Sequence, residues 1–136
     1  MVAATRREAR ERALSLEYER ETRGIGIDEL LDALSVPPDE YAAQLVRGVE
    51  QHRAEIDGLL ATHSTHWTVD RMPAVDRAML RIATFELLRE PQVASAVVIN
   101  EAVDLAKQYS TKDSGRFVNG LLAKIAETVR TPVSPA

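Results

Sequence analysis

Apolar residues recur at helical intervals along almost the whole chain, and this pattern limits the possible folds most strongly. Near the end, Phe117, Leu121, Ile125 and Val129 are spaced four apart over three turns. This spacing places side chains on one face of an α-helix, whereas a half-buried strand alternates every second residue. The sequence therefore predicts an all-α fold, a compact bundle of about seven helices in two packed sub-bundles.

Capping and breaking residues set the expected helix bounds. Thr5 is a candidate N-cap, and Gly24 and Gly26 end the first helix. We expect helices over about 5–22, 27–34, 39–60, 73–89, 94–109 and 114–129, with segment 61–69 ambiguous. Gly120, inside the last helix, predicts a close helix crossing. Residues 1–130 are expected to form a single domain, with 131–136 as a disordered tail.

Composition excludes several classes of protein. The net charge of −4 argues against nucleic-acid binding over the whole surface, so any such binding should be local. The absence of cysteine excludes disulfides and thiol chemistry and fits a reducing cytoplasm. No apolar run is long enough to cross a membrane, and the N-terminal arginines are not followed by the apolar segment of a secretory signal.

Catalytic and metal-binding patterns find little support. His63 and His66 are three residues apart, but a metal site needs a matching carboxylate, so we interpret them as surface imidazoles near Trp67. No nucleotide-binding, zinc-protease or serine-hydrolase motif is present. The sequence thus predicts no enzyme, no metal and no cofactor.

The first helix opens with a local concentration of arginine. Arg6, Arg7 and Arg10 fall on an arc of roughly a quarter turn, beside a stripe of small apolar residues that can dock on a core. Guanidinium groups match phosphate geometry with two parallel hydrogen bonds, which favours a phosphate-bearing partner. The alternative is that Arg6 and Arg10 pair with acidic residues such as Glu8 and Glu11.

A second candidate lies at the start of the last helix. Asp113 or Ser114 can cap this helix, and Lys112 and Arg116 flank its free N–H groups, with Phe117 following. A binding role requires this turn to lie beside the arginine helix.

Four other side chains each have two interpretations. Tyr18 and Tyr109 can stack on unpaired bases or can belong to the core. Arg77 and Arg81 share a helix face and can extend a basic surface or pair with nearby carboxylates, Asp76 and Glu86.

Four segments taken in order carry a resemblance to a known family. They are 6–10 with Tyr18, 75–88, 98–107 and 113–122, including the runs Ile99-Asn100-Glu101-Ala102-Val103 and Phe117-Val118-Asn119-Gly120. Together they resemble the NusB family of bacterial transcription antitermination factors, over about residues 5–130.

The resemblance implies a non-catalytic RNA-binding protein. Family members bind the single-stranded boxA element of ribosomal RNA leader transcripts together with NusE, a small-subunit ribosomal protein, and help RNA polymerase in the elongation complex to resist termination. By position, the resemblance implies RNA contacts from the following residues: Arg6, Arg7, Arg10, Tyr18, Lys112, Asp113, Ser114, Arg116 and Phe117. It also implies a NusE-facing surface on the helix that carries Arg77, Arg81 and Glu86.

Two alternatives remain open at this stage. One is a protein–protein scaffold or homodimer whose basic face is masked by a partner or by a second copy of the chain. Glu8 and Glu11 dilute the arginine patch relative to the family pattern. The other is an RNA-binding domain of the kind fused to ribosomal RNA cytosine methyltransferases.

Overall fold

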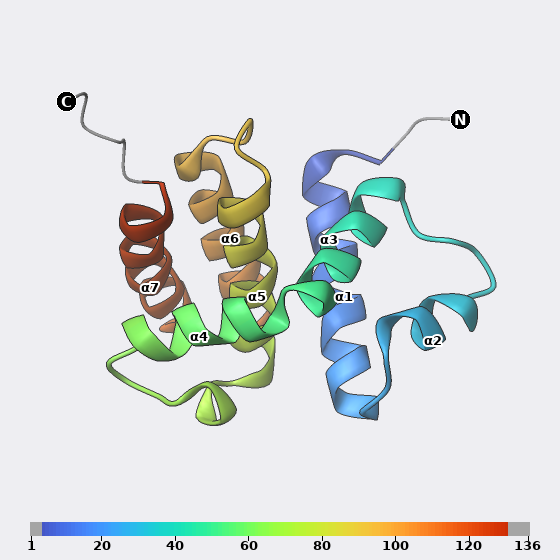
Figure 1. Cartoon of the computed structure of the whole chain (residues 1–136), viewed down its shortest axis with the longest axis horizontal. Coiled ribbons are helices and arrows are strands. Elements are labelled where there is room, and N and C mark those ends of the chain that lie inside the picture. The colour runs from blue at the N-terminus through green and yellow to red at the C-terminus, as the bar shows by residue number, and fades with distance from the viewer. Residues whose placement is uncertain (1–3, 131–136) are drawn as a thin grey trace.

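The computed structural model describes residues 4–130, which contain seven α-helices, one short 3₁₀ helix and no strand (Figure 1). The helices are α1 (Arg6–Arg23), α2 (Ile27–Asp32), α3 (Glu40–Gln51), α4 (Arg53–His63), η1 (Val69–Arg71), α5 (Ala74–Arg89), α6 (Ser95–Tyr109) and α7 (Ser114–Val129). The predicted all-α fold is confirmed. The tail expected at 131–136 lies outside the described residues.

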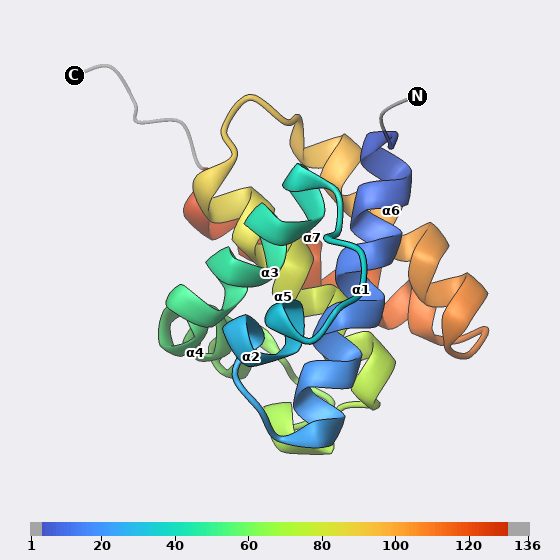
Figure 2. The ribbon, with the colours of Figure 1, turned by 90° about the vertical axis from the view of Figure 1, so that its right-hand side faces the viewer.

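The helices form two sub-bundles that share α5. Helix α1 packs on α2 and α3, while α4, α6 and α7 pack on α5, which also contacts α1 and α3. Figure 2 shows α1 between α2 and α3 on one side and α6 on the other. Every residue of α5 from Ala78 to Leu87 is buried, so even its polar side chains lie in the interior. Within residues 4–130, no helix combines the length and low polarity required to span a bilayer.

Helix α1 is fixed at both ends by local interactions. Thr5 Oγ1 accepts a hydrogen bond from the Glu8 backbone N–H at 3.0 Å, and Glu8 Oε1 accepts one from the Thr5 N–H at 2.9 Å. This capping box confirms Thr5 as the N-cap and lowers the pKa of the Glu8 carboxyl. Gly24 ends the helix in the left-handed region at φ 66°, which glycine adopts without strain.

The single helix predicted over 39–60 is two helices. The chain leaves helical geometry at His52, with φ −110° and ψ 21°, and its ring stacks on Phe85 of α5 at a centroid distance of 6.1 Å. The break redirects the chain so that Ile56 and Leu60 of α4 are fully buried against the second sub-bundle. Packing on α5 therefore overrides the continuous periodicity of this segment.

The close helix crossing expected at Gly120 occurs at Gly48 instead. A Cβ atom at Gly48 would lie 2.2 Å from Phe85 Cε1, whereas a Cβ at Gly120 would have no neighbour within 4 Å among the described residues. Glycine at position 48 therefore lets α3 approach the Phe85 ring on α5. Gly120 is exposed, and the prediction for it was wrong.

Candidate nucleic-acid interface

Arg10 was predicted to contact phosphate, but its side chain lies in the interior. It is 2% exposed, and its Nε and Nη2 donate to Glu86 Oε1 and Oε2 at 2.8 and 2.9 Å. Its Nη1 donates to Glu101 at 3.3 Å, and the Tyr41 hydroxyl donates to Glu86 at 2.8 Å. Burial disfavours the charged form of Arg10, but the hydrogen bonds and charge attraction to Glu86 outweigh the effect of burial. The pKa of Arg10 is therefore raised. Because all three nitrogens of the guanidinium donate to carboxylates within the protein, we correct the RNA-contact prediction for Arg10.

The other two arginines of the cluster remain at the surface. Arg6 is exposed, with its guanidinium carbon 3.8 Å from the centroid of the Tyr41 ring, a cation–π geometry. The Arg7 side chain is 40% exposed and pairs with Glu101 and, at 3.5 Å, with Asp104. Both side chains can reach an external anion.

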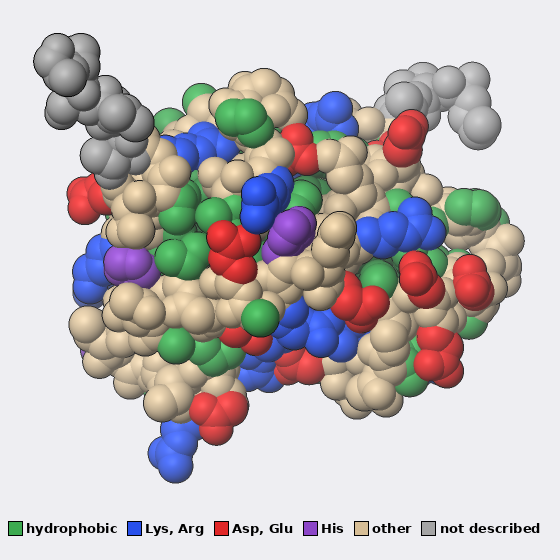
Figure 3. Space-filling view, in the orientation of Figure 1, with side chains coloured by type: hydrophobic (Ala, Val, Ile, Leu, Met, Phe, Trp, Pro, Cys, Tyr) green, Lys and Arg blue, Asp and Glu red, His purple; other side chains and the backbone are tan. Residues whose placement is uncertain are grey.

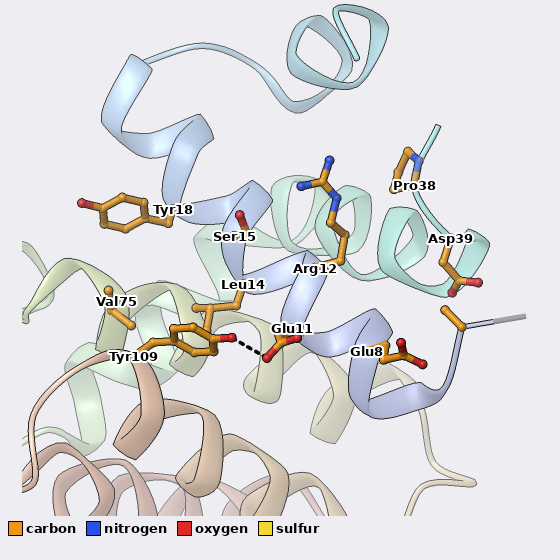
Figure 4. A pocket seen from close by; sticks show the side chains of 11 residues that line it. Glu8, Glu11, Arg12, Leu14, Ser15, Tyr18, Pro38, Asp39, Val75 and Tyr109 are labelled. Carbon is orange, nitrogen blue, oxygen red and sulfur yellow. Dashed lines mark hydrogen bonds between the residues drawn. The ribbon is translucent and has the colours of Figure 1, made fainter. Parts of the chain in front are cut away.

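A groove of about 700 Å³ crosses the outer face of α1 (Figure 4). Tyr18 and Tyr109 line it and are 43% and 47% exposed, so the interpretation of these tyrosines as core residues is wrong. The Tyr109 hydroxyl donates to Glu11, a hydrogen bond that raises the pKa of Tyr109. Leu14 and Val75 give the groove an apolar part between the tyrosines. Exposed rings above apolar side chains provide faces on which flat groups can stack.

The groove also contains Arg12, which sequence reasoning missed. Arg12 is exposed and forms no ion pair with any residue in 4–130. The available signal was the polar series Glu8, Arg12 and Ser15, which follows the i, i+4, i+7 spacing and marks the outer face of the helix. Since Glu8, Glu11 and Asp39 also line the groove, three carboxylates accompany this one arginine.

A further group of acidic side chains lies away from the groove. Acidic side chains gather over α2, where Asp28, Glu29 and Asp32 are exposed (Figure 3). A phosphate-bearing ligand is repelled from that face, which leaves α1 and the start of α7 as the better surfaces.

The end of α6, just before the turn that leads into α7, contacts α1. Tyr109 ends α6 in contact with Glu11 of α1, and the turn follows directly at Ser110. Within the turn, Ser114 is only 2% exposed, and its hydroxyl donates to Asp76 Oδ2 at 2.9 Å. It also accepts from the Thr111 N–H at 3.2 Å. We therefore correct the RNA-contact prediction for Ser114, because its side chain ties the turn to α5.

The remaining predicted residues of the turn are accessible. Lys112, Asp113 and Arg116 are exposed, and Phe117 is half-buried at the edge of a hollow of about 590 Å³. Asp113 directly precedes α7, but its side chain makes no capping hydrogen bond. Lys112, Asp113 and Arg116 therefore stay free to meet a ligand, whereas Phe117 packs edge-on against Trp67 and Ser114 is buried.

Of the three side chains predicted to face a protein partner, Arg81 and Glu86 are buried and Arg77 is half-buried, and all three pair with other residues of the chain. Arg81 donates to both carboxylate oxygens of Asp57 at 2.9 and 3.0 Å. Arg77 pairs with Glu21 and donates to the carbonyl of Met72 at 2.8 Å. Glu86 is 1% exposed and holds Arg10. The partner-contact prediction is wrong for these side chains because they join α5 to α1 and α4; the alternative of structural pairing is confirmed, with other partners.

Metal ligation finds no geometric support in the part of the chain that the structure describes. Residues 4–130 contain no group of three or more His, Asp or Glu side chains placed to hold an ion. His63 Nε2 instead lies 3.3 Å from the hydroxyl of Thr128.

Together these features define a class: a small helical binding module whose exposed arginines and tyrosines lie over α1 and continue to the start of α7. A sequence profile of the NusB family matches residues 7–127, and the chain belongs to the NusB family.

Relatives support this assignment over nearly the full length. The chain is 48% identical over 132 residues to the transcription antitermination protein NusB of Kineococcus radiotolerans, covering 94% of this chain and 97% of that protein. It is 46% identical over 127 residues to the Thermobifida fusca protein of the same name, covering 90% and 89%.

Solved structures show the same fold. NusB of T. maritima superposes with a TM-score of 0.83 at 33% identity over 93% of each chain. A chain from a crystal structure of the antitermination factors NusB and NusE in complex with double-stranded RNA has a TM-score of 0.77 at 30% identity, covering 90% of this chain and 96% of that one.

Proposed function

We propose that this protein is a transcription antitermination factor that binds the single-stranded boxA element of ribosomal RNA leader transcripts together with NusE. The observation that carries the proposal is that exposed arginines and tyrosines, Arg6, Arg12, Tyr18 and Tyr109, lie along α1 and at the end of α6, with exposed Lys112 and Arg116 shortly after them in the chain. The family supports the antitermination role, and the related complex of NusB and NusE with double-stranded RNA supports association with NusE and RNA.

Helix α1, together with Tyr109 at the end of α6, provides two kinds of contact. Arg6, Arg7 and Arg12 bind phosphates, and Tyr18 and Tyr109 stack on unpaired bases along the groove. These contacts serve different purposes, since phosphate contacts fix the path of the strand while base contacts select the sequence.

The turn extends the same path. Lys112 and Arg116 supply positive charge, Asp113 supplies an acceptor for base N–H groups, and Phe117 supplies a further ring. Ser114 holds the turn in place through Asp76 without touching the RNA.

The acidic residues that pair with Arg7 oppose the binding of phosphate to its guanidinium. In the free protein Glu101 and Asp104 pair with its guanidinium, so a phosphate must replace one of these carboxylates. Arg10, held beneath α1 by Glu86, acts as a positioning residue for the helix that carries the contacts.

The role that follows needs no catalysis. Bound to the nascent leader transcript with NusE, the protein joins the transcription elongation complex with RNA polymerase and promotes processive transcription of ribosomal RNA in the bacterial cytoplasm.

Fluorescence anisotropy of a labelled boxA-type RNA tests the proposal. We expect saturable binding that tightens when NusE is added, and clearly weaker binding of a scrambled RNA of the same composition. Equal affinity for both RNAs with NusE present would contradict the proposal. Light scattering of the same samples separates a masked homodimer, which would have twice the 15.1 kDa mass of the chain.

A further inference from the structure

An aromatic cluster joins the loop 64–68 to α7. The rings of Trp67 and Phe117 meet edge-on, with centroids 4.9 Å apart and an interplanar angle of 82°. His66 meets Trp67 in the same way at 5.7 Å. Although Phe117 is half-buried, Trp67 is 38% exposed and His66 is exposed. The indole is therefore fixed by its neighbours while part of it faces solvent.

Positive charge surrounds this cluster. Three adjoining hollows of about 590, 450 and 180 Å³ share Arg116, and four cationic side chains line them: Lys107, Lys112, Arg116 and Lys124. The only carboxylates in these linings are Asp113, which is exposed, and Asp76, which is buried and accepts a hydrogen bond from Ser114.

The charge of these four side chains is not balanced internally. Within the described range 4–130, none of them forms an ion pair, in contrast to the paired arginines on α5. One of them is held in place: a Cβ at Gly115 would lie 2.7 Å from Lys107 Cε, so the lysine stem packs directly over the start of α7. In a chain with a net charge of −4, this unpaired positive surface points to an anionic ligand.

We propose that Trp67 and Lys124, together with Arg116 and Phe117 of the proposed RNA path, form a second stacking site for single-stranded RNA, beyond the groove on α1. An unpaired base stacks on the exposed indole, and the two cations neutralise the neighbouring phosphates. The inference rests on the proposed RNA-binding function and extends the strand past the 112–117 turn, which borders the same hollows. Aromatic faces combined with unpaired cations suit a nucleotide better than a neutral protein surface.

The chain contains one tryptophan, so its intrinsic fluorescence reports on this site alone. The test is to titrate the unmodified protein with an unlabelled boxA-type RNA extended by several nucleotides at both ends, and to follow tryptophan emission. We expect quenching that saturates at the same RNA concentration as the anisotropy of the labelled RNA.

The outcomes separate this inference from the function on which it rests. Saturated anisotropy without any change in tryptophan emission overturns the second stacking site and leaves the proposed function intact. Absence of RNA binding in both measurements overturns both. Quenching by NusE alone, with no further change on addition of RNA, shows that the protein partner occupies this surface and also overturns the inference.

Variants provide an independent check. Trp67→Leu should weaken binding of the extended RNA by about 5- to 100-fold, and Trp67→Phe by less because it keeps a ring. Arg116→Ala should reduce the slope of log affinity against log salt by about 0.7. Arg47→Ala is the matched control, since Arg47 is exposed on α3 and lines none of the three hollows. Equal effects of Arg116→Ala and Arg47→Ala would overturn the site even if Trp67→Leu fails to fold.

Discussion

Arg10 and Glu86 lie 76 positions apart in the sequence, and their side chains form a two-pronged ion pair in the interior, at 2.8 and 2.9 Å. The pair joins α1 to α5, the helix that both sub-bundles share. Tyr41 of α3 donates to the same carboxylate, so three helices meet at Glu86. The first arginine cluster of the chain is therefore divided: Arg10 is a structural residue, and its neighbours Arg6 and Arg7 are at the surface.

Replacing Arg10 should unfold the protein before it affects RNA binding directly. Arg10→Ala leaves the Glu86 carboxylate buried without its cation, which we expect to cost about 3–5 kcal/mol of unfolding free energy. Urea unfolding followed by circular dichroism measures this loss. Arg12→Ala is the matched control, because its exposed side chain has no ion pair within residues 4–130, and it should change stability by less than about 0.5 kcal/mol. Similar stability of the two variants would show that the buried pair does not hold α1 on α5.

Two glycines should respond oppositely to the same substitution. Gly48→Ala places a methyl group 2.2 Å from the Phe85 ring and should destabilise the fold by about 1–3 kcal/mol or more. Gly120→Ala meets no described atom within 4 Å in an exposed helical position and should stabilise by up to about 1 kcal/mol. Thermal unfolding of both variants checks the sign. An unchanged melting temperature for Gly48→Ala would contradict the close approach of α3 to the Phe85 ring.

The carboxyl group of Glu21 should make stability depend on pH in the acidic range. Burial raises its pKa, but hydrogen bonds and charge attraction from Arg77 and Arg81 outweigh burial, so the pKa is lowered from 4.5. A carboxyl whose pKa is lower in the folded state contributes its full stability above the unfolded pKa and loses it as pH falls through the folded pKa.

Glu21→Gln should therefore be less stable than the natural protein by about 1–3 kcal/mol near neutral pH. The difference should shrink as pH falls below 4.5 and through the lower pKa of the folded state, because the natural carboxyl becomes protonated there. Urea unfolding of both proteins across this range measures it. A difference that stays constant over the range would argue against the ion pairs as its source.

Arg130 should contribute to stability through the end of α5. Its guanidinium donates to the backbone carbonyls of Glu86, Leu87, Glu90 and Val93 at 2.6–3.0 Å. These carbonyls lie at and just beyond the helix C-terminus, where a cation is favourable. Arg130→Ala should cost about 1–3 kcal/mol, and Arg130→Lys should recover only part of this, since an ammonium cannot reach all four oxygens. Equal stability of the three proteins in thermal unfolding would refute this capping role.

Local signals predicted the helices well. Thr5 and the glycines after α1 mark its ends, and the periodic apolar residues mark α5, α6 and α7 within a residue or two. The break at His52 was not predictable in this way, because the ring that His52 stacks on, Phe85, lies more than thirty positions further along the chain.

The site was predictable only in part, for the same reason. The composition around Arg10 indicates a basic surface, but the carboxylates that pair with Arg10 in the interior come from α5 and α6. The same holds for Ser114, whose partner Asp76 lies on α5. Conversely, Arg12 did not stand out in the sequence, and its importance follows from the groove around it.

If exposed arginines on α1 bind RNA phosphates, the affinity for RNA must fall as the salt concentration rises. The salt dependence of binding is therefore the most direct test. The affinity for boxA-type RNA should be measured over a range of salt concentrations for the natural protein and for Arg6→Ala/Arg12→Ala. With about three to five phosphates neutralised, log affinity should fall against log salt with a slope of roughly −2 to −3.5. The double variant should reduce that slope by about 1.4 while keeping the folded circular-dichroism spectrum. A slope near zero, or the same slope for both proteins, would contradict the account.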